Sequence, residues 1–331
     1  MAEPGVMTYT VRRLTSADAP AIPELTLRVN GPGYIHAEMY HPERLIRLNR
    51  SGELVSVVAL DDRNEVVGHY ALERPNLDPI AESGEAMVLP EHQHHHLLDR
   101  MRSVLEEEAR QEHLTGVFGN TVTHHVFSQK TEERFGAHPI AILLGASPAE
   151  AHRDAHGLSQ RVSLLTYFKF VADAGETAVH APAHHRDAIE RIYRRVGRRV
   201  NFRDPAPARG AGKLESSCDA KIGRGQIRIA NPGIDSIAQL EAERDRLLSE
   251  CAVVYLNIPL GNPAAEQLCI EAERLGFFFS GLDLRPASEG DYLRLQFLPS
   301  PIDLSLVQTD GEPARELASY VAAERERIAR K

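Results

Sequence analysis

One stretch, residues 82–113, constrains the fold of this chain more than any other, because an extended segment leads through a polar loop into a long amphipathic helix. Apolar residues at positions 101, 104 and 105 recur with helical spacing, so one face of this helix must be buried. A strand, a loop and a helix N-terminus in this order leave backbone N–H groups unpaired, and such groups attract phosphate. The loop is rich in histidine: His92, His94, His95 and His96.

Length and charge narrow the class of protein. With 331 residues the chain can form two domains of ordinary size. Its formal charge of −9 argues against nucleic-acid binding, because neutralising phosphates requires clustered Lys and Arg. No run approaches the roughly 18 apolar residues of a membrane span, so no membrane partner is expected. Cys218, Cys251 and Cys269 show no CxxC spacing and indicate reduced thiols in a cytoplasmic protein.

Apolar runs predict the elements that precede the helix. Residues 9–13 alternate as a first strand, and residues 54–60 and 66–72 are two strands joined by the turn sequence DDRNE. The Gly- and Pro-broken segment 30–40 is a loop, either lining a pocket or running over the surface. The surface interpretation is favoured, because loops lie at the surface by default.

Val88-Leu89-Pro90-Glu91 ends the predicted strand, and Gln93 opens the loop. In this order the segments resemble the Gcn5-related N-acetyltransferase (GNAT) superfamily, in which such a loop and the following helix hold the pyrophosphate of coenzyme A. The resemblance implies acetyl-CoA or another acyl-CoA as donor. At two positions where the family has glycine, whose missing Cβ lets the backbone approach phosphate, this chain has His96 and Leu98. The donor-binding residues implied are Met87, Val88, Gln93, His94, His95, His96, Leu97 and Leu98.

The same resemblance implies the catalytic residues. His125, Ser128 and Glu132 occupy the family's Asn, Ala and Tyr positions before the Phe-Gly pair at 135–136, so the tyrosine that protonates the leaving thiolate is absent. Glu85, on the strand before the loop, is implied as the base, and His125 or Ser128 as the proton donor. A solvated, non-catalytic Glu85 is the alternative. A nucleophilic Ser128 paired with His124 is disfavoured, because the chain has no GxSxG elbow.

The histidine loop allows three interpretations. Imidazole is a common ligand of zinc, copper and nickel. Adjacent loop side chains rarely converge on one ion, however, and no helical HxxxH pair is present in this loop, so no metal is expected. The second interpretation is an exposed polar loop without a ligand. The third is a loop that contacts pyrophosphate or a carrier, and the helix N-terminus behind the loop supports it.

The second half repeats the same order of elements. A linker at 147–159 separates residues 1–150, the candidate acyl-CoA domain, from residues 160–331. Arg274-Leu275-Gly276-Phe277 resembles the family's helix ending, whereas Asn231-Pro232-Gly233 is too short for a phosphate loop. The fold class expected is α/β (α+β), with two GNAT-like mixed sheets flanked by helices in tandem.

Two hypotheses of function follow. The first is an N-acyltransferase that moves an acyl group from coenzyme A, or from the pantetheine of an acyl carrier protein, to a small amine. The second is a catalytically silent tandem module that binds a ligand or partner in the old cleft. The absent glycines and tyrosine favour the second, and the dense polar residues at 122–130 favour the first.

Overall fold

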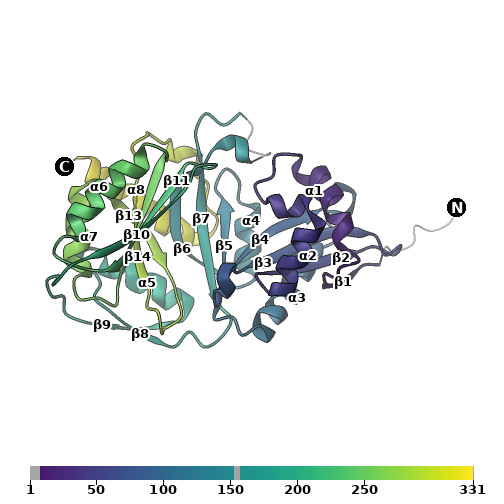
Figure 1. Ribbon diagram of the computed structural model, residues 1–331, viewed down its shortest axis with the longest axis horizontal. Coiled ribbons are helices and arrows are strands. Elements are labelled where there is room, and N and C mark those ends of the chain that lie inside the picture. The colour runs from purple at the N-terminus through teal and green to yellow at the C-terminus, as the bar shows by residue number, and fades with distance from the viewer. Residues whose placement is uncertain (1–7, 153–156, 331) are drawn as a thin grey trace. The chain divides into compact units, whose positions relative to one another are not determined.

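The computed structural model describes residues 8–152 and 157–330, and the chain divides into two compact units, Met1–Gly119 and Asn120–Lys331 (Figure 1). No helix among the described residues is long and apolar enough to cross a membrane.

The first unit is a sheet of strands in the order β1-β2-β3-β4-β5, with helices before β2 and between β4 and β5. Strands β1 to β4 are antiparallel neighbours, whereas β4 and β5 are parallel and joined by helix α3. The elements are β1 (Thr10–Arg13), α1 (Ile22–Asn30), α2 (Pro42–Ser51), β2 (Leu54–Leu60), β3 (Val66–Glu73), β4 (Ile80–Val88), α3 (Leu97–Gln111) and β5 (Gly116–Val122).

Hydrophobic burial explains why this sheet forms. Every residue of β2 is buried, although successive side chains point to opposite faces, so both faces of β2 are covered. Helices α2 and α3 both pack on β2. The apolar face of α3 buries Leu97, Met101, Leu105 and Ala109, as the helical spacing in the sequence predicts.

Strand β4 carries a bulge and then parts from β5. His69 pairs with Met87 and Ala71 with Gly84, so Glu85 and Ala86 together oppose Tyr70. The parallel pairing with β5 covers only Ile80–Glu82 of β4. Among the described residues, the second half of β4 therefore has no strand partner on that side.

The second unit holds a larger sheet, in the order β7-β6-β13-β14-β12-β11-β10, and a separate parallel pair, β8 and β9. Helix α8 packs on β6 and β13, and α6 packs on β10, β11 and β12. The elements are α4 (Phe127–Arg134), β6 (His138–Ser147), β7 (Val162–Phe170), β8 (Glu176–Val179), α5 (Arg186–Val196), β9 (Arg199–Phe202), β10 (Lys213–Asp219), β11 (Arg224–Asn231), α6 (Ser236–Leu248), β12 (Val253–Pro259), α7 (Ala265–Arg274), β13 (Phe278–Asp283), β14 (Tyr292–Phe297) and α8 (Gly311–Ala329).

A glycine is required where β13 approaches β6. Gly281 pairs with Ala141 at a φ of 144°, and a Cβ on Gly281 would lie 2.2 Å from the carbonyl oxygen of Ile140. Any larger residue would push the two strands apart. The neighbouring Ser280 hydroxyl donates to the carbonyl of Ile142 at 2.5 Å, and this hydrogen bond also holds β13 against β6.

The order of elements repeats along the chain. The run β4-α3-β5-α4-β6-β7 recurs as β11-α6-β12-α7-β13-β14, and in both runs the two strands around the first helix are parallel. The copies differ in one respect: β11 and β12 pair at five positions, Arg224 to Arg228, whereas β4 and β5 pair at three. The strands that part in the first copy therefore stay together in the second.

The mixed α/β class expected from the sequence is confirmed. The compact units divide after Gly119, however, and not in the expected linker, of which residues 153–156 lie outside the described part of the chain. The reason is that β7, expected as the opening strand of the second half, pairs with β6. The limits of 1–150 and 160–331 for two GNAT-like domains remain a prediction.

Candidate active site: a buried histidine–carboxylate cluster

Four titratable side chains of the first unit meet beside β4, and we call them the His36 cluster: His36, Glu38, Glu73 and Glu85. Nδ1 of His36 lies 2.9 Å from Glu73 Oε1, 3.3 Å from Glu85 Oε1 and 3.4 Å from Glu38 Oε1. The ring of Tyr34 lies 5.0 Å from that of His36. The cluster therefore joins the segment between α1 and α2, the end of β3 and the bulge of β4.

Glu85 is the innermost member. Its side chain has no exposed surface, and neither carboxyl oxygen has a hydrogen-bond partner among the described residues. Nδ1 of His36 is close enough for an ionic contact with Glu85, but the angles do not make a hydrogen bond. A single N–H cannot serve three carboxylates, so the cluster has more acceptors than donors.

The environment sets the charges of the cluster. Burial raises the pKa of Glu85 well above its usual value, and the nearby charge of Glu73 adds to this effect against the opposing influence of His36. Burial alone would raise the pKa of Glu73, but contact with His36 lowers it. Burial alone would lower the pKa of His36, but contacts with Glu38, Glu73 and Glu85 raise it. Contact with His36 also lowers the pKa of Glu38. Two neighbouring carboxyls whose pKa values move apart are typical of acid–base sites.

The backbone at Glu85 is strained. Its φ of 58° lies in the left-handed region, which costs a residue other than glycine roughly 1–3 kcal/mol. Nδ1 of His69 donates to the carbonyl of Glu85 at 3.1 Å and holds the bulge. Burial lowers the pKa of His69 to about 4, so its ring is neutral and Nδ1 can carry the proton while Nε2 does not. His69 is a positioning residue for Glu85.

A buried arginine ties the bulged strand to helix α3. The side chain of Arg102 is 1% exposed and donates to Ser83 on β4 and, at 3.3 Å, to the hydroxyl of Tyr70. The hydroxyls of Tyr70 and Ser83 are 3.0 Å apart. The N-terminus of α3 is therefore held in a fixed place relative to β4.

The predicted donor-binding loop is exposed. Gln93, His94, His95 and His96 are exposed, and Leu97 turns inward as the first residue of α3. His96 is the N-cap, with a φ of 54° and no side-chain capping bond, and His94 has a φ of 67°. Both histidines thus adopt the left-handed conformation that glycine adopts without strain.

Two neighbouring residues affect how this loop could bind an anion. Asp99 stands in the first turn of α3, where its carboxylate already complements the helix dipole. His92 is tied to Tyr9 by a 3.1 Å contact between Nδ1 and the hydroxyl, so it does not face a ligand freely. Of the remaining predicted donor-binding residues, Met87 and Val88 are buried and Leu98 is partly buried.

His125 and Ser128 belong to the second unit, so their convergence with Glu85 stays a prediction. His124 precedes α4 and is not part of the helix, and the buried Ser128 hydroxyl has no hydrogen-bond partner among the described residues. The suggested His124–Ser128 pair is therefore wrong for this structure. Gln129 is fully buried and bridges the carbonyls of residues 122, 125 and 308, which gives this polar block a structural role.

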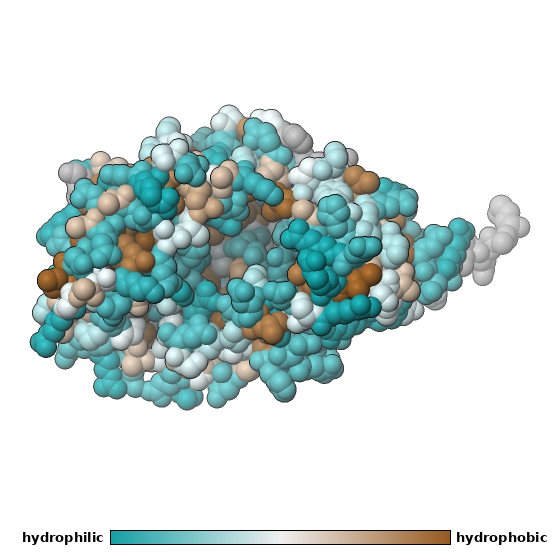
Figure 2. Space-filling view, in the orientation of Figure 1, coloured by the Kyte–Doolittle hydropathy of each residue, from teal (hydrophilic) through white to brown (hydrophobic). Residues whose placement is uncertain are grey.

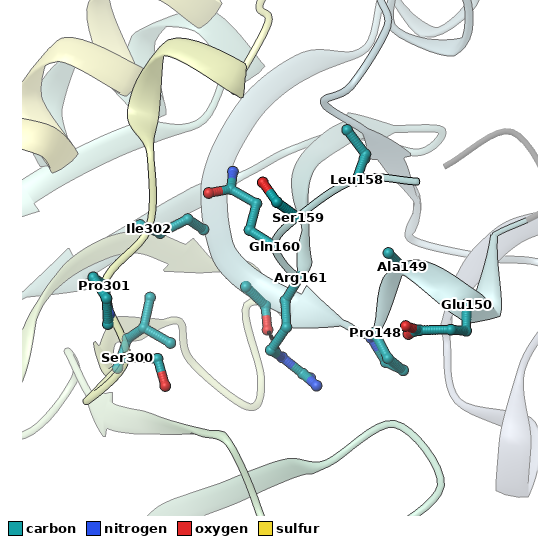
Figure 3. A pocket seen from close by; sticks show the side chains of 12 residues that line it. Pro148, Ala149, Glu150, Leu158, Ser159, Gln160, Arg161, Ser300, Pro301 and Ile302 are labelled. Atoms are coloured by element: carbon teal, nitrogen blue, oxygen red, sulfur yellow. Dashed lines mark hydrogen bonds between the residues drawn. The ribbon is translucent and has the colours of Figure 1, made fainter. Parts of the chain in front are cut away.

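The pockets of the two units lie elsewhere. One of about 440 Å³ in the second unit is bordered by Glu150, Arg161 and Pro301, with none of the predicted site residues in its lining (Figure 3). Arg161 donates to the carbonyls of Gly145 and Ile222, so its guanidinium is already engaged. A pocket of about 530 Å³ in the first unit reaches Glu91 and His92. In the view of Figure 2, hydrophobic residues appear only in small separate patches.

The sequence singled out Glu85 but missed its partners. His36 and Glu38 lie in the segment 30–40, for which the surface interpretation is favoured, and Glu73 ends a strand whose other residues are mostly apolar. The acidic side chains at 38, 73 and 85 carry no local signal, because only the pairing of β3 with β4 brings two of them together. The closest available signal was the aromatic, Gly-rich character of the loop around His36.

No family model and no curated protein matches this chain. Solved structures do match half of it. A GNAT-family acetyltransferase from Staphylococcus aureus covers 50% of this chain and 100% of its own length at 11% identity and a TM-score of 0.38. The ribosomal-protein-S5-alanine acetyltransferase of Vibrio fischeri covers 50% of this chain and 94% of its own length, at 17% identity and a TM-score of 0.39. The PaiA N-acetyltransferase of Thermoplasma acidophilum, in complex with coenzyme A, covers 48% of this chain and 98% of its own length, at 11% identity and a TM-score of 0.35. About half of this chain is thus similar in structure to solved acetyltransferases, among them one described as a GNAT-family member.

Proposed function

We propose that this protein transfers an acyl group from coenzyme A, or from carrier-bound pantetheine, to a small amine. The observation that carries the proposal is the His36 cluster, three carboxyls and an imidazole buried at the bulge of β4, where that strand has parted from β5. Strained backbone at a buried, under-satisfied carboxyl is typical of functional sites, because folding alone does not favour it.

The acceptor side of the proposal rests on charge. An amine is a cation at neutral pH, and a cluster with more carboxylates than cationic partners attracts it. When the amine nitrogen attacks the thioester carbonyl, it must lose a proton, and a carboxylate of the cluster accepts that proton. The C–S bond then breaks, and the sulfur leaves as a thiolate that takes up a proton to give the free thiol.

The donor side rests on β4 and α3. The half of β4 without a strand partner offers backbone groups to the amides of pantetheine, in the manner of an added strand. The N-terminus of α3, held by Arg102, offers its N–H groups to phosphate. The histidines at 94, 95 and 96 stand beside it, and in their protonated form they attract phosphate where glycines are absent.

A silent binding module is the second candidate. The observation in its favour is the loop itself, in which two left-handed histidines replace flexible glycine and Asp99 places a negative charge in the first helical turn. A phosphate bound there would meet that charge. In this second function the protein binds a ligand but does not catalyse its conversion.

Calorimetric titration with acetyl-CoA and with free coenzyme A, followed by an acylation assay on small amines, tests the proposal. Glu85→Gln should depress turnover at neutral pH and leave donor affinity nearly unchanged, with partial recovery at higher pH, where the amine loses its proton unaided. Glu82→Gln, on the same strand, is the matched control. Equal turnover of the Glu85 variant and the parent at every pH would favour the silent module.

The loop is tested separately. Replacing His95 and His96 with Asp should weaken coenzyme A binding through repulsion between carboxylate and phosphate, while the folding of the exposed loop is preserved. Asp99→Asn should have the opposite effect. If neither variant changes the affinity for coenzyme A, the loop is not part of the donor site.

A further inference from the structure

We propose that the His36 cluster is a binding site for a divalent transition-metal ion, Zn²⁺ or Mn²⁺, contrary to the expectation from the sequence that no metal is bound. This inference does not depend on acyl transfer. Its basis is that one imidazole nitrogen and three carboxylate oxygens all lie within 4.8 Å of one another in the first unit.

The spacing fits a coordination sphere. With metal–ligand bonds of about 2.1 Å, neighbouring ligand atoms are about 3.0 Å apart in an octahedron and about 3.4 Å apart in a tetrahedron. The separations between Nδ1 of His36 and the three carboxylate oxygens are 2.9, 3.3 and 3.4 Å. The carboxylate oxygens lie within 4.8 Å of one another, so a closer approach of these oxygens would complete the coordination of one ion.

Glu85 points to a ligand independently of the acidic cluster. Its side chain is fully enclosed and reaches into the cluster, yet both its oxygens lack a hydrogen bond among the described residues. A buried polar group without a partner is costly, and an unseen ion is one of its ordinary explanations. Glu73 Oε1 is likewise buried, and its contact in the cluster is the 2.9 Å ion pair with Nδ1 of His36.

A divalent ion would also allow all three carboxyls to be ionised together. With a neutral imidazole and a divalent ion, the net charge of the cluster is −3 + 2 = −1, and each carboxylate gains a direct ionic bond.

The ligand types select the metal. Carboxylates alone suit Mg²⁺ and Ca²⁺, but an imidazole nitrogen favours first-row transition metals. Affinity should follow the usual order, with Mn²⁺ weaker than Co²⁺ and Co²⁺ weaker than Zn²⁺, and Mg²⁺ should bind poorly. Because the ion would occupy the same carboxylates as a cationic amine, the two ligands should compete.

The test uses the chelator-treated full-length protein and the metals alone. Exposed loop histidines also take up transition metals, so His94, His95 and His96 are first replaced with Ala to remove that background. In this background we expect one Zn²⁺ per chain by calorimetry, and absorption bands of bound Co²⁺ that Zn²⁺ displaces. Glu85→Gln and the more exposed Glu38→Gln should each weaken Zn²⁺ binding by at least the roughly 10- to 100-fold seen when outer-sphere partners are lost.

Two further variants localise the ion. Glu43→Gln, on the surface of α2, should leave Zn²⁺ binding unchanged. Glu324→Gln removes a ligand from a second group, His184, His185 and Glu324 in the second unit, and should also change nothing. The proposal fails if Zn²⁺ binding disappears with the loop histidines, is lost in the Glu324 variant, or survives in Glu38→Gln. Because Glu38 lies at the rim, that last outcome is informative even if the Glu85 variant does not fold.

Discussion

Arg198 and Asp291 form an ion pair that the second unit encloses almost completely. Their side chains are 1% and 0% exposed, and Nη1 of Arg198 lies 2.7 Å from Oδ1 of Asp291. Tyr193 and the backbone N–H of Arg285 also donate to this carboxylate. Burial still raises the pKa of Asp291, although Arg198 opposes the shift. The buried carboxylate is therefore stable only because Arg198, Tyr193 and Arg285 together satisfy it.

Removing the cation from this pair should be severe. Arg198→Met keeps most of the side-chain volume but leaves Asp291 buried without its counter-charge, which typically costs about 3–5 kcal/mol of unfolding free energy. Arg199→Met is the control, since the neighbouring Arg199 is 74% exposed and its loss should cost less than about 1 kcal/mol. Urea unfolding of both variants measures the difference. Similar stabilities for the two would contradict this account.

Two of the three cysteines lie in contact. The Sγ atoms of Cys218 and Cys251 are 2.9 Å apart, and both are free thiols. Burial raises the pKa of Cys251 to about 12, so the half-exposed Cys218 is the thiol that reacts first.

Oxidised glutathione should therefore link these two cysteines. Cys218 attacks the glutathione disulfide, Cys251 then displaces the bound glutathione, and two molecules of reduced glutathione leave as the protein disulfide forms. Closing a loop of this length should add up to about 4 kcal/mol to the free energy of unfolding. Mass spectrometry of the oxidised protein and its unfolding midpoint check both points. Cys218→Ser should abolish the effect, and linkage through Cys269 instead would show the contact to be wrong.

At the scale of elements, helix α3 ends in a motif that normally carries glycine. The N–H of Leu114 donates to the carbonyl of Ala109, and that of His113 to the carbonyl of Arg110, the two bonds of a Schellman motif. His113 stands at the glycine position with a φ of 54° and is exposed. A histidine there costs roughly 1–2 kcal/mol in backbone strain.

His113→Gly should relieve that strain. The free energy of unfolding should rise by about 1 kcal/mol, because the glycine loses some entropy on folding while the strain disappears. Glu112→Gly, one residue earlier at a φ of −80°, is the control and should destabilise, since no strain exists there. Denaturant titration of the two variants gives opposite signs if the motif is as described. A destabilising His113→Gly would mean that its side chain makes an essential contact.

The elements that sequence patterns predicted best are those with one buried face. Strand β2 matches its predicted range, Leu54–Leu60, and helix α3 follows from its apolar spacing. Strand β10 was missed because it is an exposed edge strand, with Ser and charged residues in place of a buried apolar face. The bulge at Glu85 was also missed, since a local sequence does not show that two residues will oppose one across a strand pair.

At the scale of the whole molecule, stability at low pH should depend on a hydrogen-bond network in the second unit. This network joins α7, α8 and the residues before α5. Glu273 is 7% exposed and accepts from His185 at 3.0 Å and from Arg327 at 2.9 Å. Arg327 also binds Glu324, and His185 meets the hydroxyl of Tyr320 at 2.8 Å. These groups therefore satisfy one another by hydrogen bonds and ion pairs.

The pH dependence follows from Glu273. Burial alone would raise its pKa, but hydrogen bonds from His185 and Arg327 lower it from 4.5 to about 2. A carboxyl whose folded pKa is below its unfolded value adds stability that is fully present above pH 4.5 and is lost as the pH falls towards 2. After allowance for partial screening, this contribution is about 2 kcal/mol.

Glu273→Gln should therefore be less stable than the parent by about 2 kcal/mol near pH 7, and the difference should shrink steadily below pH 4.5 and vanish near pH 2. Urea unfolding of both proteins over that pH range measures it. Glu326→Gln, on the exposed face of α8 with 66% of its side chain accessible, is the control and should follow the parent at every pH. A pH-independent gap between Glu273→Gln and the parent would mean that packing, and not the charge of Glu273, holds α7 to α8.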